Sequence, residues 1–121
     1  MSADTTTPPA STVMPGHAVQ LVYVTFPQLA CAREIARDVV QGRLAACANL
    51  MPGATSLYEW QGKLCEEHEC VGVFKCTAAA LPALMARIRE LHPYEVPCIV
   101  SMPLAAGHEP FLRWVCAQST Q

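Results

Sequence analysis

The first half of the chain changes from strand-like to helical spacing of its hydrophobic residues. Residues 19–25 (VQLVYVT) are rich in β-branched and aromatic side chains and predict a short strand. Over residues 28–41 the apolar side chains recur every three or four positions, which predicts an amphipathic helix. Gly42 follows, where a left-handed residue commonly ends a helix. The apolar run 44–51 is too short for an independent helix, so we expect a buried strand there.

The middle of the chain has the pattern of a long hairpin. Pro52-Gly53 should close the preceding strand, because both residues disfavour regular structure. Residues 55–60 then alternate between two faces, and Gln61-Gly62 is a plausible hairpin turn in which glycine supplies a positive φ. The polar segment 63–69 predicts an exposed limb of the hairpin, and residues 70–76 (CVGVFKC) predict a further strand.

The second half repeats the helix–strand order and adds a helix. Residues 77–91 carry one apolar stripe and predict a second helix, with Pro82 tolerated only in its first turn. The segment 92–97 (HPYEVP) should be a rigid loop, since each proline biases its predecessor away from the helix. We expect a last strand over residues 98–104 and a short helix over residues 109–117.

The resulting order β-α-β-β-α-β-α is that of a split βαβ repeat. It predicts an α+β, ferredoxin-like sandwich, in which two helices cover one face of an antiparallel sheet, with an extra C-terminal helix. We assign this domain to residues 19–121. The Thr- and Pro-rich residues 1–18 cannot bury enough apolar area to offset their ordering entropy, so we expect a disordered tail.

The predicted strands are apolar on both faces, although the helices can cover only one. Leu21 to Val24 are all apolar or aromatic, and Cys98 to Val100 are consecutive apolar residues. Leaving a few hundred Å² of apolar sheet in water costs several kcal/mol at ~25 cal/mol per Å². Self-association in a closed ring would cover this face. The alternative is that some apolar residues are simply tolerated at the surface.

Composition excludes several functional classes. Only 15% of the 121 residues are charged, the net charge is −2, and the eight basic residues are scattered. We therefore expect neither nucleic-acid nor membrane binding, both of which need clustered Lys and Arg. The seven cysteines include no CxxC pair and are best interpreted as thiols of a cytoplasmic protein. No nucleophile elbow or phosphate loop is present, so we expect no enzyme, with a cysteine nucleophile as the alternative.

Four sequence segments resemble the divalent-cation tolerance family known as CutA. They are LAACAN at 44–49, PGATSLYEWQGK at 52–63, HPYEVP at 92–97 and FLRW at 111–114. The resemblance extends over about residues 19–116. It implies a ferredoxin-like protomer, a homotrimer similar in shape to the PII signalling proteins, and a link to copper and other divalent cations. It implies no known reaction and no organic cofactor.

The metal link rests on few residues of this chain. Some family members have a cysteine where this chain has Val24, and a histidine where it has Leu91, so only His92 remains of that copper site. Cys98 follows six positions later, and a thiolate with an imidazole could bind Cu(I) or zinc weakly, completed by water or another subunit. The alternative is structural: His92 would hydrogen-bond the loop backbone and Cys98 would be a core thiol.

Two further groups carry weaker hypotheses. Cys65, His68 and Cys70 have metal-ligating side chains, but on one strand Cys65 would face away from the other two. Large residues within the family motifs or beside them could line an intersubunit cleft: Tyr58, Trp60, Lys63, Lys75, Tyr94 and Trp114. Their lysines would suit a small anionic ligand, as in a PII-like signalling or scaffold module. Alternatively, the aromatic residues only anchor an oligomer interface.

Overall fold

A computed structural model describes residues 19–120 of the chain. The predicted tail, residues 1–18, lies outside the described residues. The elements are β1 (Val19–Phe26), α1 (Leu29–Gln41), β2 (Cys47–Trp60), β3 (Lys63–Thr77), α2 (Leu81–Leu91), β4 (Ile99–Pro103) and α3 (Glu109–Gln118). Their order is the one that the hydrophobic pattern predicts.

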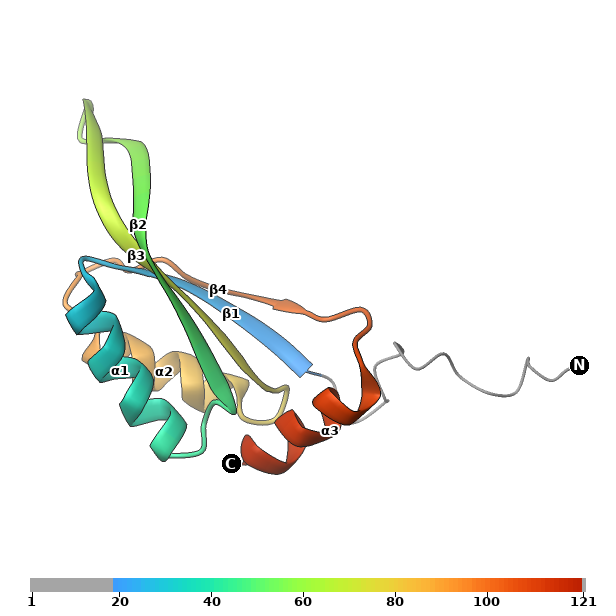
Figure 1. The fold of residues 1–121 in the computed structure, drawn as a ribbon. Helices are drawn as coiled ribbons and strands as arrows, with labels where there is room; N and C mark the ends of the chain where they lie inside the picture. The colour runs from blue at the N-terminus through green and yellow to red at the C-terminus, as the bar shows by residue number, and fades with distance from the viewer. Residues whose placement is uncertain (1–18, 121) are drawn as a thin grey trace, which may run out of the picture.

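The four strands form one antiparallel sheet in the order β2-β3-β1-β4. Helices α1 and α2 lie side by side on one face of this sheet, whereas α3 lies at one end, and the β2–β3 hairpin extends beyond the body of the domain (Figure 1). This arrangement is the ferredoxin-like α+β sandwich with an extra C-terminal helix, so the predicted fold class is confirmed.

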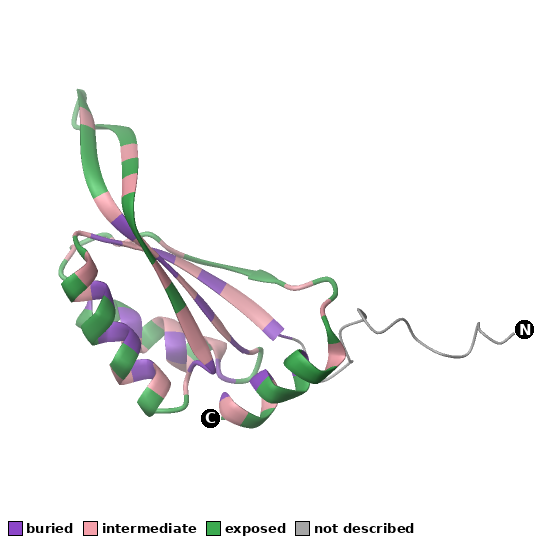
Figure 2. Cartoon of the chain, in the orientation of Figure 1, coloured by how far each residue is buried: buried purple, intermediate pink, exposed green. Residues whose placement is uncertain are grey.

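The core lies between the sheet and the two helices. Alternate residues of β1, namely Val22, Val24 and Phe26, are fully buried against Leu84 and Ile88 of α2 and the apolar side of α1. Figure 2 shows the buried positions on the facing sides of helix and sheet. A second, smaller cluster packs α3 onto the end of the sheet and comprises Val19, Ala46, Leu112 and Val115.

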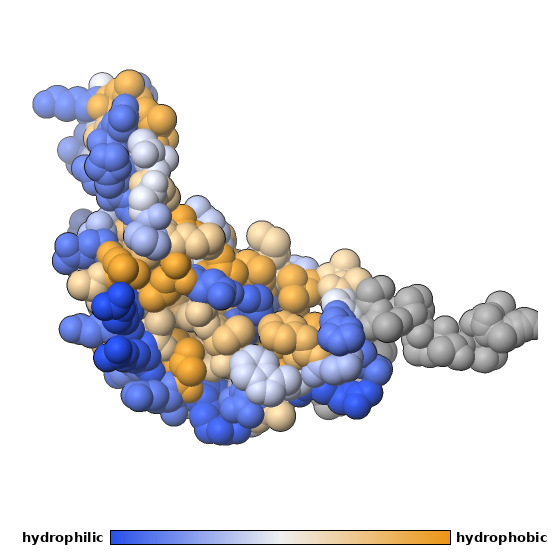
Figure 3. All heavy atoms as spheres, in the orientation of Figure 1, coloured by the Kyte–Doolittle hydropathy of each residue, from blue (hydrophilic) through white to orange (hydrophobic). Residues whose placement is uncertain are grey.

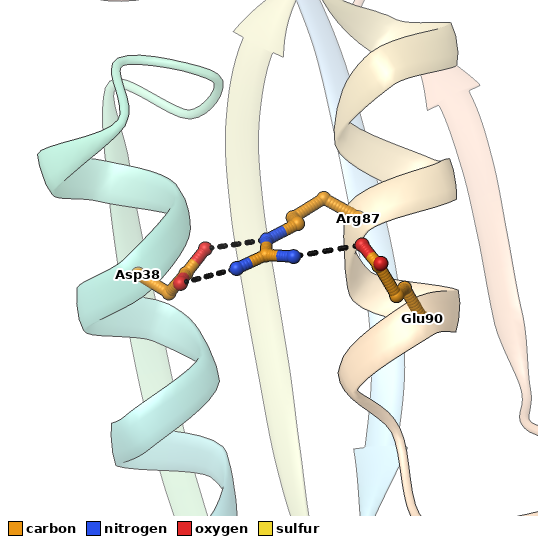
Figure 4. A network of polar contacts seen from close by, with 3 residues as sticks. All are labelled: Asp38, Arg87 and Glu90. Atoms are coloured by element: carbon orange, nitrogen blue, oxygen red, sulfur yellow. Dashed lines mark hydrogen bonds and ion pairs between the residues drawn. The ribbon is translucent and has the colours of Figure 1, made fainter.

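An ion pair joins the two helices at the edge of this core. Arg87 of α2 donates two hydrogen bonds to Asp38 of α1, each 2.9 Å long, and a third to Glu90 at 2.7 Å (Figure 4). This hydrogen-bonded guanidinium holds the pKa of Asp38 below its usual value. Both side chains are more than one-third exposed, so solvent screening limits their contribution to stability.

The hairpin differs from the prediction at its middle and agrees at its tip. The expected strand 44–51 begins three residues later and does not close at Pro52-Gly53, because β2 continues to Trp60 through a register irregularity between Met51 and Ala54. Proline is tolerated here because β2 is an edge strand. At the tip, Gln61 and Gly62 have φ of 52° and 78°, the positive pair of a tight hairpin turn.

Two helix ends also differ from the prediction. Gly42 has a φ of −77°, and the left-handed residue is Arg43, with a φ of 64°. The Arg43 side chain donates to the carbonyl of Ala117 at 2.9 Å, which ties the end of α1 to the end of α3. The second helix begins at Leu81 rather than residue 77, since Thr77 still belongs to β3 and its hydroxyl accepts the Ala80 N–H at 3.1 Å.

The sheet face opposite α1 and α2 carries apolar side chains over its middle, and α3 packs only at one end of the sheet. Its strands place Tyr23 of β1 between Val73 of β3 and Val100 of β4. Val100 is 50% exposed and Met102 is 51% exposed. On the side of the molecule drawn in Figure 3, hydrophobic residues gather in a band between the hydrophilic outer surface of the helices and the hairpin.

Candidate functional site

A cavity of about 560 Å³ lies where the hairpin meets the loop before β4. Tyr58 and Trp60 reach it from β2, Glu67 and Glu69 from β3, and Thr25 from the end of β1. The loop contributes Pro93, Tyr94, Glu95, Val96 and Cys98. Three carboxylates and three aromatic side chains therefore share one concave surface, which is the usual shape of a small-molecule site.

The His92 side chain fixes the loop beside this cavity. It is 7% exposed, and its ring stacks on Phe26 with the ring centroids 5.2 Å apart. Nδ1 accepts the backbone N–H of Tyr94 at 3.1 Å, so the proton is on Nε2, which donates to the carbonyl of Thr25 at 2.8 Å. Both ring nitrogens are thus occupied by backbone groups, as the structural alternative for His92 expects.

Hydroxyl groups hold the carboxylates of the hairpin. The two oxygens of Glu69 accept the Ser56 hydroxyl at 2.6 Å and the Tyr94 hydroxyl at 2.8 Å. Burial and the hydrogen bond to Glu69 raise the pKa of Tyr94 above its ordinary value. Burial, with the nearby charge of Glu67, also raises the pKa of Tyr58. At neutral pH the Tyr94 phenol is therefore protonated and donates to Glu69.

The two predicted metal ligands have different surroundings. Cys98 is exposed and lines the cavity, so it is not the core thiol of the structural alternative. His92 is buried and does not line the cavity, and it could bind a metal only by giving up one of its two hydrogen bonds. Within residues 19–120, no three His, Cys, Asp or Glu side chains are grouped closely enough to hold a metal ion. Of the two predicted ligands, only Cys98 is exposed at the cavity, and the described residues form no ready-made metal centre around it.

The Cys65, His68 and Cys70 group does not form a site in this chain. All three residues lie on the continuous strand β3. Cys70 is 1% exposed and packs in the core, whereas His68 is exposed and Cys65 is half-buried on the hairpin. This difference follows from the strand's passage from the sheet body to the exposed hairpin.

The six predicted cleft residues separate into two places. Tyr58, Trp60 and Tyr94 line the cavity, and Lys63 pairs with Trp60 across the hairpin turn. Lys75 lies at the far end of β3, where its Nζ donates to Asn49 Oδ1 at 2.7 Å. Trp114 of α3 contacts Phe111, whose ring lies 6.0 Å from that same Nζ.

The carboxylates of the cavity were not among the predicted site residues. The sequence pattern places Glu67 and Glu69 in a polar hairpin limb beside the Cys65, His68 and Cys70 group, without a role of their own. The signal that could have identified them is the strand alternation of residues 63–69, which places both on one face, opposite Glu66. The hydrogen bond between Glu69 and Tyr94, by contrast, joins residues 25 positions apart and has no sequence signature.

The same arrangement of sheet, helices and hairpin occurs in solved structures of divalent-cation tolerance proteins. The structure from Thermus thermophilus has a TM-score of 0.81 and 42% identity, and covers 84% of this chain and 99% of that chain. The structure of CutA1 from Oryza sativa has a TM-score of 0.83 and 27% identity, and covers 93% of this chain and 99% of that chain. The fold is therefore that of PII-like divalent-cation tolerance proteins.

The family model described as CutA1 divalent ion tolerance protein matches residues 20–118, and this chain belongs to that family. Protein CutA of Mus musculus is 46% identical over 110 residues, which are 89% of this chain and 62% of that protein. The chain thus spans less than two-thirds of the length of that relative. The divalent-cation tolerance protein CutA of Thermus thermophilus is 45% identical over 79% of this chain and 93% of that protein. The predicted family, that of the divalent-cation tolerance proteins, is confirmed.

Proposed function

We propose that this chain forms a cytoplasmic homotrimer that takes part in tolerance to divalent cations and binds copper or a similar soft metal ion weakly. Relatives with up to 46% identity are named for divalent-cation tolerance or as CutA, which supports the cation link. The cytoplasmic assignment is supported by seven cysteines that are all present as thiols. One similar structure, from Archaeoglobus fulgidus, is described as periplasmic. No helix within residues 19–120 is long and apolar enough to cross a membrane.

The observation that carries the assembly is the uncovered apolar sheet face. Tyr23, Val73 and Val100 adjoin one another across three strands, and Met51 and Met102 extend this surface to both edges of the sheet. Each 100 Å² of apolar area removed from water contributes about 2.5 kcal/mol. A trimer that covers this face on every copy would bury an area typical of a stable interface, ~800 Å² per partner.

Light scattering on the purified chain tests the assembly. We expect three times the protomer mass for the wild type and a smaller species for Val100→Glu, since the new charge would be buried in the interface. Ala30→Glu is the matched control, because it adds the same charge at an exposed position of α1 and should leave the mass unchanged. A wild type that remains a monomer at micromolar concentration would refute the trimer.

Metal binding is proposed at the mouth of the cavity, with Cys98 as the ligand that the chain offers without rearrangement. The thiol is exposed, and Glu95 lines the same cavity. A single thiolate, helped by carboxylate, water or another subunit, gives weak binding with a preference for soft ions. His92 would join only if the metal displaced Tyr94 N–H or Thr25 O, both of which now occupy its ring nitrogens.

An anaerobic competition between the protein and a coloured Cu(I) chelator tests this site. We expect Cys98→Ser to weaken Cu(I) binding at least tenfold, and Cys65→Ser, a half-buried thiol on the hairpin, to change it by less than twofold. Adding His92→Phe to Cys98→Ser then measures the contribution of the imidazole. Equal Cu(I) affinity of the wild type and Cys98→Ser would remove this cavity from consideration as the metal site.

A further inference from the structure

The charge of the cavity is the opposite of what the anionic-ligand hypothesis requires. Among its described lining residues, Glu67, Glu69 and Glu95 are acidic, and none is Lys, Arg or His. Lys75 lies at the other end of β3, where it is bound to Asn49. The cavity therefore attracts cations and repels anions.

The lining also distinguishes between kinds of cation. The three carboxylates do not converge as metal ligands, since no such group occurs among residues 19–120. Aromatic side chains form another part of the wall, with Trp60 55% exposed and Tyr58 41% exposed. The volume of about 560 Å³ also leaves room for a small molecule.

We propose that this cavity binds an alkylguanidinium group, supplied by a small molecule or by an arginine side chain. A guanidinium is planar, remains charged at all physiological pH values, stacks on aromatic rings and donates paired hydrogen bonds to carboxylates. Trp60, Tyr58 and Tyr94 supply the aromatic surfaces, and the glutamates supply the acceptors. Although Ser56 and Tyr94 already bind the two oxygens of Glu69, each carboxylate oxygen can accept a second hydrogen bond.

Strand β3 offers a matched pair of variants for this site. Glu67 lines the cavity, whereas its neighbour Glu66 lies on the opposite face of the same strand, and both are exposed. Glu67→Gln and Glu66→Gln therefore remove the same charge from the same hairpin, and only the first removes a carboxylate from the cavity. Trp60→Leu is a second variant, which removes an aromatic part of the cavity wall at an exposed position.

Isothermal titration of the full chain with propylguanidinium at 0.15 M salt is the test, with propylurea as the neutral molecule of the same shape. We expect propylguanidinium to bind and propylurea not to bind. Glu67→Gln and Trp60→Leu should each weaken propylguanidinium about tenfold, and Glu66→Gln by less than twofold. An N-acetyl-arginine amide that binds more tightly than propylguanidinium would identify a protein side chain as the source, and the reverse order would identify a small molecule.

If Glu66→Gln and Glu67→Gln weaken propylguanidinium binding equally, the proposal is overturned, because binding would then depend only on the general charge of the surface. Equal binding of propylurea, or no binding of propylguanidinium to the wild type, would also overturn it. Metal is absent from this titration, so these outcomes leave the Cu(I) competition at Cys98 as a separate measurement.

Discussion

Replacing His92 by phenylalanine separates the two ways in which this side chain supports the loop at the cavity. The larger ring can keep the stacking on Phe26, whose centroid lies 5.2 Å away, but it cannot hydrogen-bond. Tyr94 N–H and Thr25 O then lose the partners that now lie at 3.1 and 2.8 Å. Each polar group left without a partner in a buried position costs about 1–3 kcal/mol.

We therefore expect His92→Phe to lower the free energy of unfolding by about 2–6 kcal/mol. The measurement is urea denaturation at one fixed protein concentration, because the stability of an oligomer depends on concentration. His68→Phe is the control, since His68 lies exposed on β3, and such a change should stay within ~0.5 kcal/mol.

If the free energy of unfolding of His92→Phe equals that of the wild type, the two hydrogen bonds from the His92 ring to the backbone do not stabilise the loop. The ring nitrogens would then be available to a metal at no cost in stability. A stable His92→Phe variant would also weaken the reason for making Cys98, rather than His92, the first metal ligand.

Three further outcomes follow from the packing and from the pKa shifts. Gly72→Ala places a Cβ 2.7 Å from the Phe26 ring, and should lower the free energy of unfolding in urea by about 1–3 kcal/mol; unchanged stability would contradict this packing. A thiol-reactive dye should label exposed Cys98 within minutes, but label buried Cys76, whose pKa burial raises to about 11, only after unfolding. The pKa of Tyr94 is raised in the folded state, so the protonated phenol stabilises the fold fully below about pH 10 and less as the pH rises further. The free energy of unfolding of the wild type should therefore approach that of Tyr94→Phe at higher pH.

Sequence periodicity predicts this fold well because most of its signals are local. Ala32, Ile35 and Val39 recur at helical spacing, and all three are buried in the structure. The Gln61-Gly62 dipeptide predicts the turn that closes the hairpin. The continuation of β2 through Pro52-Gly53 was missed because the same residues end a central strand but are tolerated at a bulge of an edge strand, and only the sheet order distinguishes the two.

The candidate site was less predictable because it depends on contacts between distant segments. The motif HPYEVP indicated that His92 and Tyr94 matter, but not that His92 would bind Thr25, 67 positions away. Neither residue type nor spacing shows that Tyr94 donates to Glu69. The acidic character of the cavity likewise arises only when β3 folds beside the loop, which is why a sequence with two suitable lysines suggested an anionic ligand.

The length of the β2–β3 hairpin affects how often the part of the cavity that the hairpin forms opens to solvent. A two-stranded ribbon that extends past the helices lacks the packing that protects the sheet body, and such a ribbon is only marginally stable by itself. Amide hydrogens near Trp60 should therefore exchange with deuterated solvent through local opening of the hairpin. Those of β1 should exchange only on global unfolding. The tip of the hairpin, which carries Trp60, can thus open without breaking the two hydrogen bonds by which His92 holds the loop.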